Sequence, residues 1–154
     1  MQIKTTTPLH VLTFGVRTTL ADLDKYAITV PKQLYAEAVR LGLLVSGPLY
    51  WRYLGADGRI ETQFSLQIGL PVERPGGHYP AGNGAFTFEE WPAFRSLALD
   101  HTGPWDQLHE TYGKGIQWLL HEGFTIGIEA RECYLNVDLA EPVNNRTEVG
   151  IGIL

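Results

Sequence analysis

The sequence predicts an α+β fold in which a β-α-β-β unit occurs twice within one domain of 154 residues. Segments with strand-like alternation are interspersed with two helix-like segments, and their order is the same in both halves. A Pro- and Gly-rich connection separates the two repeats, about 1–72 and 92–154. Apolar residues make up 44% of the chain, enough to bury a core at this length. We therefore expect an antiparallel sheet with pseudo-two-fold symmetry, helices on one side and a central groove.

The first half begins with residues 9–18, a β-branched segment that alternates as a strand does. Residues 31–41 predict a helix that opens on proline, where the missing N–H is harmless, and Gly42 is expected to end it. Residues 49–54 and 61–70 follow as two strands joined by a tight turn. The helix carries an apolar stripe that we expect to face the sheet: Leu34, Tyr35, Ala38 and Val39.

The second half follows residues 71–92, which are rich in Pro and Gly and predict a surface connection. Residues 94–100 predict a strand, and residues 103–105 begin a helix. Strands at 131–136 and 147–154 complete this half, so the order of the first half recurs.

The second helix has an apolar stripe that we expect in the core rather than in a binding site: Trp105, Leu108, Tyr112, Ile116 and Leu119. Gly113 and Gly115 weaken this helix by about 1 kcal/mol each relative to alanine. Close packing or bending of the helix is therefore expected at these glycines.

The two halves align at a constant spacing. Gly42 and Gly123, which end the predicted helices, are 81 residues apart (123 − 42), and so are Tyr53 and Tyr134 (134 − 53). Such internal repetition is a stronger indication of architecture than local propensity.

The same spacing makes Trp51 the counterpart of Glu132, and a shift for the hairpin loop makes Gln63 the counterpart of Glu148. Strand alternation places Glu132 and Tyr134 on one face, and it directs Glu148 away from the aliphatic side chains of the last strand. If the aliphatic faces pack on the helices, both glutamates project from the opposite, open face. The groove would then be lined by Trp51, Tyr53, Gln63, Glu132, Tyr134 and Glu148.

Composition and motifs exclude several classes of function. The net charge is −5 and no basic cluster occurs, which argues against direct nucleic-acid binding. No apolar run is long enough to span a bilayer and no signal peptide is evident, so we expect a cytoplasmic protein without a membrane segment. The histidines lack metal-ligand spacing, and there is no phosphate loop or dinucleotide motif, so no cofactor or metal is expected. Cys133 is expected on the packed side, as a small buried residue rather than a nucleophile.

Six motifs occur along nearly the whole chain: Val30-Pro31, Gly47-Pro48-Leu49-Tyr50, His101-Thr102-Gly103-Pro104-Trp105, residues 112–118, Arg131-Glu132-Cys133-Tyr134-Leu135-Asn136 and Thr147-Glu148-Val149-Gly150-Ile151. In this order they resemble the GyrI-like family, the effector-binding domains of gyrase-inhibitor-type proteins and multidrug-sensing activators. The resemblance implies the duplicated fold and a central aromatic pocket. It also implies that acidic residues on the late strands attract lipophilic cations, a role that would fall on Glu132 and Glu148.

The two acids have alternative interpretations. Glu148 is the first choice as the anionic anchor, because Gly150 and Gly152 leave room beside it. Alternatively it is an exposed strand acid that pairs with Arg146 or another base. Glu132 is expected either to contact the ligand or to hydrogen-bond Tyr134 and its neighbours and so orient them.

The preferred function is therefore that of a standalone protein that binds lipophilic compounds, cationic or neutral, for sequestration or sensing. The alternative is a hydrolase of strained or electrophilic lipophilic compounds, as in some members of the resembled family. It would use Glu148 or Glu132 together with Tyr134 or Trp51. A third possibility is a protein-interaction module like the gyrase inhibitors, with DNA gyrase or a separate regulator as its partner.

Overall fold

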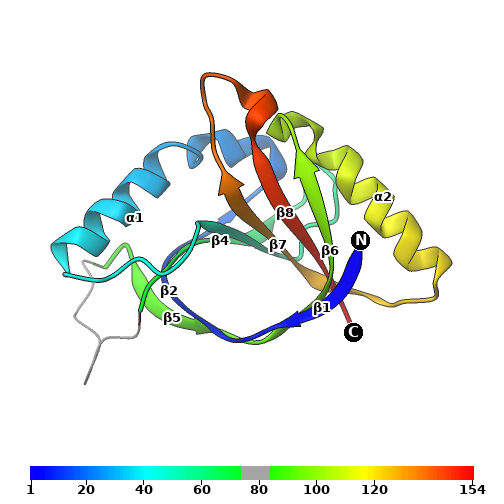
Figure 1. Cartoon of the computed structure of the whole chain (residues 1–154), viewed down its shortest axis with the longest axis horizontal. Coiled ribbons are helices and arrows are strands. Elements are labelled where there is room, and N and C mark those ends of the chain that lie inside the picture. Colours follow the sequence, from blue (N-terminus) through cyan, green and yellow to red (C-terminus); the bar gives the residue numbers. More distant parts are fainter. Residues whose placement is uncertain (74–83) are drawn as a thin grey trace.

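The computed structural model describes residues 1–73 and 84–154. Both helices pack on one face of an eight-stranded antiparallel sheet with the order β1-β6-β8-β7-β3-β4-β2-β5 (Figure 1). The strands are β1 (Gln2–Thr6), β2 (Leu9–Thr18), β3 (Tyr50–Leu54), β4 (Phe64–Pro71), β5 (Thr87–Trp91), β6 (Phe94–Thr102), β7 (Ile126–Asn136) and β8 (Arg146–Ile153). The helices are α1 (Thr29–Arg40) and α2 (Leu108–His121), with short 3-10 segments η1 (Leu20–Lys25), η2 (Trp105–Gln107) and η3 (Pro142–Asn144).

The predicted duplication is confirmed. The order β2-α1-β3-β4 recurs as β6-α2-β7-β8, and the sheet is arranged symmetrically about its central pair, β3 and β7. Trp51 is the Cα partner of Ile68 in the first hairpin, and Glu132 is the Cα partner of Val149 in the second. Each residue of the first pair lies 81 positions before its counterpart in the second (132 − 51 and 149 − 68). Trp51 and Glu132 are also partners of each other across β3 and β7. The pseudo-two-fold axis therefore passes between these two residues.

The expected shift for the hairpin loop is wrong. Arg52 is the partner of Gln67 and Cys133 is the partner of Glu148, so the counterpart of Glu148 is Gln67 (148 − 67 = 81). Gln63 lies before β4, which begins three residues later than expected, and its side chain is exposed. Because both hairpins have the same register, no shift was needed.

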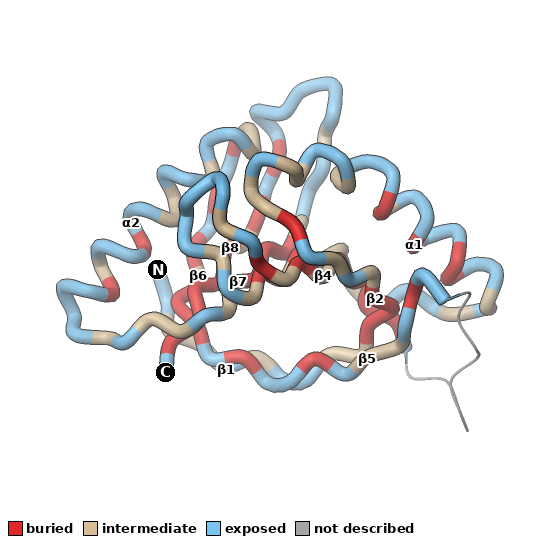
Figure 2. Tube along the Cα trace, turned by 180° about the vertical axis from the view of Figure 1, so that it is seen from behind, coloured by how far each residue is buried: buried red, intermediate tan, exposed pale blue. Residues whose placement is uncertain are grey.

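Helix α1 covers β2 and β4 and forms the first part of the core. Leu34 and Ala38 are buried there as predicted, but Tyr35 and Val39 are 45% and 80% exposed, so the predicted stripe is wrong for these two. The buried stripe begins one turn earlier, at Val30. Val30, Leu34 and Ala38 are spaced four residues apart, so they lie on one face of the helix. Figure 2 shows that buried positions alternate with exposed ones along α1 and that buried positions occur on β2 and β4.

Helix α2 packs on β6 and β8 as the second part of the core. A Cβ atom at Gly115 would lie 2.7 Å from Cδ1 of Ile151 and 3.0 Å from Cδ1 of Leu99, so this glycine allows close contact with the sheet. Nothing lies within 4 Å of such an atom at Gly113. The expected close packing is thus confirmed at Gly115 alone.

Two edge strands were not predicted. Strand β1 pairs with β6, and β5 pairs with β2, so residues 87–91 belong to the sheet and not to a surface connection. Residues 74–83 of that expected connection lie outside the described residues. The sheet curves so that β1 and β5 lie away from the helices (Figures 1 and 2). Trp91 of β5 is buried against Gly69, where a Cβ atom would approach its ring to 2.6 Å.

Among the described residues, no helix is both long and apolar enough to cross a membrane.

Candidate functional site

The carboxylate of Glu132 lies at the centre of the helix-covered face and is almost fully enclosed, with 4% of the residue exposed. Its Oε1 accepts hydrogen bonds from the hydroxyls of Tyr53 (3.0 Å) and Tyr134 (2.5 Å). Its Oε2 accepts one from the hydroxyl of Tyr112 (2.7 Å). These three tyrosines come from β3, β7 and α2, so both halves of the chain contribute to the site. We call these four residues the Glu132 cluster.

Aromatic rings, including those of the three tyrosines, surround the carboxylate of Glu132 in two layers. Trp51 is buried beside Tyr53 in the inner layer, and its ring meets that of Tyr134 edge to face, with centroids 6.2 Å apart. Tyr112, Tyr134 and Trp105 are partly exposed and form the outer layer. The ring of Trp105 lies edge-on to that of Tyr134, with centroids 5.6 Å apart. A molecule reaching Glu132 from solvent on this side would meet the outer layer first.

Burial dominates the electrostatics of the cluster. It raises the pKa of Glu132, and the hydrogen bonds from Tyr134, Tyr112 and Tyr53 offset this only in part. Burial, followed by the proximity of the Glu132 charge, raises the pKa of each of the three tyrosines well above its ordinary value. The tyrosines therefore remain neutral donors. No lysine or arginine in residues 1–73 and 84–154 forms an ion pair with Glu132, so its hydrogen-bond donors are three neutral hydroxyls, and His101 adds a smaller electrostatic contribution that lowers its pKa.

Glu148 lies on the other face of the sheet. Its Oε1 is 2.8 Å from Nζ of Lys4, and its Cα partner on β7 is Cys133. The expectation that both glutamates project from one open face is therefore wrong. Glu132 lies opposite Val149, so it shares the helix-covered face with the aliphatic residues, and the neighbouring register positions point the other way. The alternative interpretation of Glu148, a strand acid paired with a base, is confirmed, and the base comes from β1.

Cys133 is buried and free, as expected, but it faces the Glu148 side and not the helices. Burial raises the pKa of its thiol, which keeps it protonated. His101 is also buried, and its Nε2 lies 2.9 Å from the carbonyl oxygen of Pro104. Its Nδ1 lies 2.7 Å from Oγ1 of Thr111 on α2. Within the described part of the chain, no group of three or more His, Cys, Asp or Glu residues is arranged to hold a metal ion.

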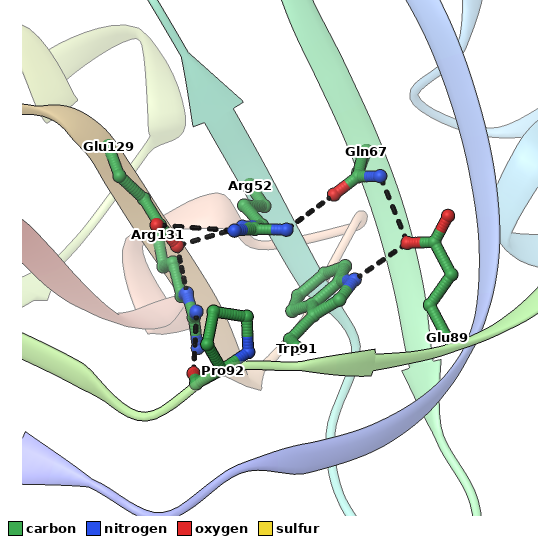
Figure 3. A network of polar contacts seen from close by, with 7 residues as sticks. All are labelled: Arg52, Gln67, Glu89, Trp91, Pro92, Glu129 and Arg131. Atoms are coloured by element: carbon green, nitrogen blue, oxygen red, sulfur yellow. Dashed lines mark hydrogen bonds and ion pairs between the residues drawn. The ribbon is translucent and has the colours of Figure 1, made fainter.

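The face away from the helices contains a second polar network, shown in Figure 3. Glu129 accepts hydrogen bonds from Nε of Arg131 (2.6 Å) and from Nε of Arg52 (2.8 Å). Burial raises the pKa of Glu129, but the hydrogen bonds from the two arginines outweigh it, and the net pKa is lowered. The guanidinium of Arg131 also lies over the rings of Trp91 and Phe94, at 5.4 and 4.4 Å from their centroids. This network is compensated in charge and joins β5 and the start of β6 to the central strands.

The predicted site residues therefore separate into two groups. Trp51, Tyr53, Glu132 and Tyr134 are brought together, whereas Glu148 and Gln63 lie elsewhere. Tyr112 packs against the core as expected, and its hydroxyl also donates to Glu132, which was not expected. Its position on the sheet-facing stripe of α2 was the available signal, because that stripe must reach the face on which Glu132 lies.

Comparison with known proteins agrees with this arrangement. The sequence model of a protein family, the GyrI-like small molecule binding domain, matches residues 1–154. The chain belongs to the GyrI-like family. No match to a curated protein was found.

Solved structures share the fold of this GyrI-like domain at low sequence identity. The EcmrR C-terminal domain has a TM-score of 0.77 and 20% identity, covering 99% of this chain and 96% of that one. SAV2435 bound to tetraphenylphosphonium has a TM-score of 0.64 and 10% identity, covering 100% and 94%. A hydrolase encoded by lin2189 from Listeria innocua has a TM-score of 0.68 and 13% identity, covering 99% and 91%. At these identities the likeness shows the fold alone.

Proposed function

We propose that this GyrI-like domain binds a lipophilic cation, with the carboxylate of Glu132 as the counter-charge. The observation that carries the proposal is a buried carboxylate that accepts from three neutral hydroxyls and, among the described residues, has no lysine or arginine as an ion-pair partner. Burying an unpaired charge is unfavourable, and a bound cation removes part of that cost.

The magnitudes favour a cation with apolar substituents. A unit charge about 4 Å from the carboxylate gains about 4 kcal/mol at an effective dielectric constant of about 20. Each ring face that the cation contacts adds about 0.5–2 kcal/mol. Trp51, Tyr53 and Tyr134 supply rings on the same face as Glu132, and their apolar surfaces suit a hydrophobic ligand.

Binding requires the outer layer to move, because Glu132 is enclosed without a ligand. Tyr134 and Trp105 are partly exposed, so rotation of these side chains is the shortest route to the carboxylate. The fold likeness to SAV2435, whose structure holds tetraphenylphosphonium, supports this class of ligand.

The test is a calorimetric titration of tetraphenylphosphonium into the wild-type chain, Glu132→Gln and Glu148→Gln, which measures the affinity of each for the cation. Glutamine removes the charge and keeps one acceptor oxygen for the tyrosine hydroxyls, while an amide NH2, which donates, replaces the other oxygen. We expect Glu132→Gln to weaken binding by about 100-fold or more, which corresponds to roughly 3 kcal/mol. Glu148→Gln, which removes a charge on the other face, should change binding by less than about twofold. Equal binding by wild type and Glu132→Gln would remove Glu132 from this role.

Hydrolysis in the same pocket is a second candidate. The raised pKa of Glu132 favours a protonated carboxyl that can act as a general acid, and Tyr134 donates to the same oxygen as Tyr53. A structural neighbour from Listeria innocua is described as a hydrolase. Incubation with strained or electrophilic lipophilic compounds, followed by mass spectrometry, should reveal a product that has gained one water. Equal product from wild type and Glu132→Gln would end this candidate.

The physiological setting is part of the same proposal. Sequestration or sensing by a standalone cytoplasmic domain fits a site made wholly within one chain. A protein partner such as DNA gyrase or a separate regulator stays a prediction, and it would use an outer surface away from the Glu132 cluster.

A further inference from the structure

Two buried polar atoms beside the Glu132 cluster have no hydrogen-bond partner within residues 1–73 and 84–154. They are Nε1 of Trp105 and Oγ1 of Thr147. Thr147 is only 1% exposed, and its Cα partner on β7 is Tyr134. The ring of Trp105 lies against the ring of Tyr134. Both side chains therefore lie beside Tyr134, whose hydroxyl donates to Glu132.

Both groups belong to the helix-covered side of the sheet. Thr147 alternates with Glu148 along β8, so it shares the face of Val149, the Cα partner of Glu132. Trp105 lies in η2, directly before α2. His101, the other Cα partner of Thr147, has both ring nitrogens engaged, with Thr111 and Pro104.

The chemistry of the two groups restricts what can satisfy them. An indole N–H only donates, and a threonine hydroxyl can donate as well, so an oxygen acceptor suits both. Buried polar groups in folded proteins nearly always have a partner, and a group without one calls for an explanation. A ligand that displaces the ring of Tyr134 would come next to both atoms.

We propose that the ligand of this site is a lipophilic cation that also carries a hydrogen-bond acceptor, such as a carbonyl or ether oxygen, which accepts from Trp105 and Thr147. The inference rests on the proposed function and specifies its ligand class. The cationic centre binds at Glu132, and the acceptor lies beyond the ring of Tyr134, so Trp105 and Thr147 determine specificity.

The test compares two triphenylphosphonium probes of the same shape. In one the alkyl chain ends in a methyl ketone, and in the other it ends in an isopropyl group. We expect the wild-type chain to prefer the ketone by roughly fivefold to tenfold. Trp105→Phe and Thr147→Val, which remove the donor and keep most of the side-chain volume, should each reduce this preference, measured as the ratio of the two affinities within one variant, at least twofold.

Thr13→Val is the matched control, because Thr13 is another buried threonine whose Oγ1 lacks a partner and it lies on β2, away from the cluster. It should leave the preference unchanged. If both probes bind through Glu132 with equal affinity, or if the preference persists in both variants, the inference is overturned and the proposed function stands. If neither probe binds, both are overturned.

Discussion

Glu132 and Glu148 lie on neighbouring strands but project from opposite faces of the sheet. Glu132 is held by three tyrosine hydroxyls beneath the helices, whereas Glu148 pairs with Lys4 on the other face. Of the lysines and arginines that the structure describes, none forms an ion pair with Glu132, whereas Glu148 is paired with Lys4. The two acids therefore provide matched variants, since the same substitution tests a buried charge at one position and a paired, partly exposed charge at the other.

Glu132→Gln should make the unliganded protein more stable at neutral pH. The pKa of Glu132 is raised in the folded state, so the folded chain binds more protons and its stabilisation is complete below the unfolded pKa and lost as pH rises through the folded pKa. Glutamine does not ionise, so the variant does not lose stability as the pH rises through the folded pKa of Glu132. In urea unfolding from about pH 4 to 8, the free energy of unfolding of Glu132→Gln relative to that of the wild type should therefore increase with pH. A difference that is constant across this range would contradict the prediction, and Glu148→Gln is the control.

Tyr112→Phe should destabilise the protein by about 1–3 kcal/mol at neutral pH, because it removes the hydroxyl that donates to Oε2 of Glu132. The loss should be smaller in acid, where the carboxyl is protonated. Chemical unfolding at both pH values measures this. Tyr35→Phe, at an exposed position on α1, is the control and should cost less than about 0.5 kcal/mol. An equal loss at both pH values would mean that the hydroxyl does not act through the carboxylate charge.

Arg131→Ala should destabilise the fold by about 3–5 kcal/mol, because it leaves a half-buried Glu129 with one arginine fewer and empties the space between two rings. Arg59→Ala breaks an ion pair between exposed side chains, with Glu61, and should cost no more than about 1 kcal/mol. Thermal and urea unfolding of the two variants compare them directly. Similar losses would show that the network contributes no more than a surface pair.

Gly113→Ala and Gly115→Ala separate helix propensity from packing within one helix. At Gly113 the added methyl group meets nothing within 4 Å, so alanine should stabilise α2 by about 0.5–1 kcal/mol. At Gly115 it would approach Ile151 to 2.7 Å, so overpacking of about 1–3 kcal/mol should cancel or exceed that gain. Unfolding free energies of the two variants should therefore differ in sign or by more than about 1 kcal/mol. Equal stabilisation would show that Ile151 and Leu99 yield freely.

The repeated order of elements could be predicted because each signal is local. Strand alternation at residues 9–18 and the glycines that end the helices, Gly42 and Gly123, depend only on neighbouring residues, and both glycines have positive φ (67° and 82°). The edge strands β1 and β5 could not be predicted in this way, because they are polar and lack the burial pattern that marks a central strand.

The site was predictable in part for a related reason. Alternation correctly placed Glu132 with Tyr134, but it does not say which face receives the helices. The error for Glu148 follows from this, because its face depends on the register with β7 and its partner Lys4 is 144 residues away. The apolar stripe of α2 indicates that Tyr112 faces the sheet, but it does not indicate which strand residue the hydroxyl reaches, because that depends on how the helix lies across the strands.

The central pair of Trp51 and Glu132 explains why one chain must hold both repeats. In a homodimer of identical units, whatever stands at the dyad faces its own copy: indole would meet indole, or carboxylate would meet carboxylate and repel it. Covalent linkage of two unequal units removes this restriction. An acid can then stand beside an aromatic ring at the one place where perfect symmetry would forbid it.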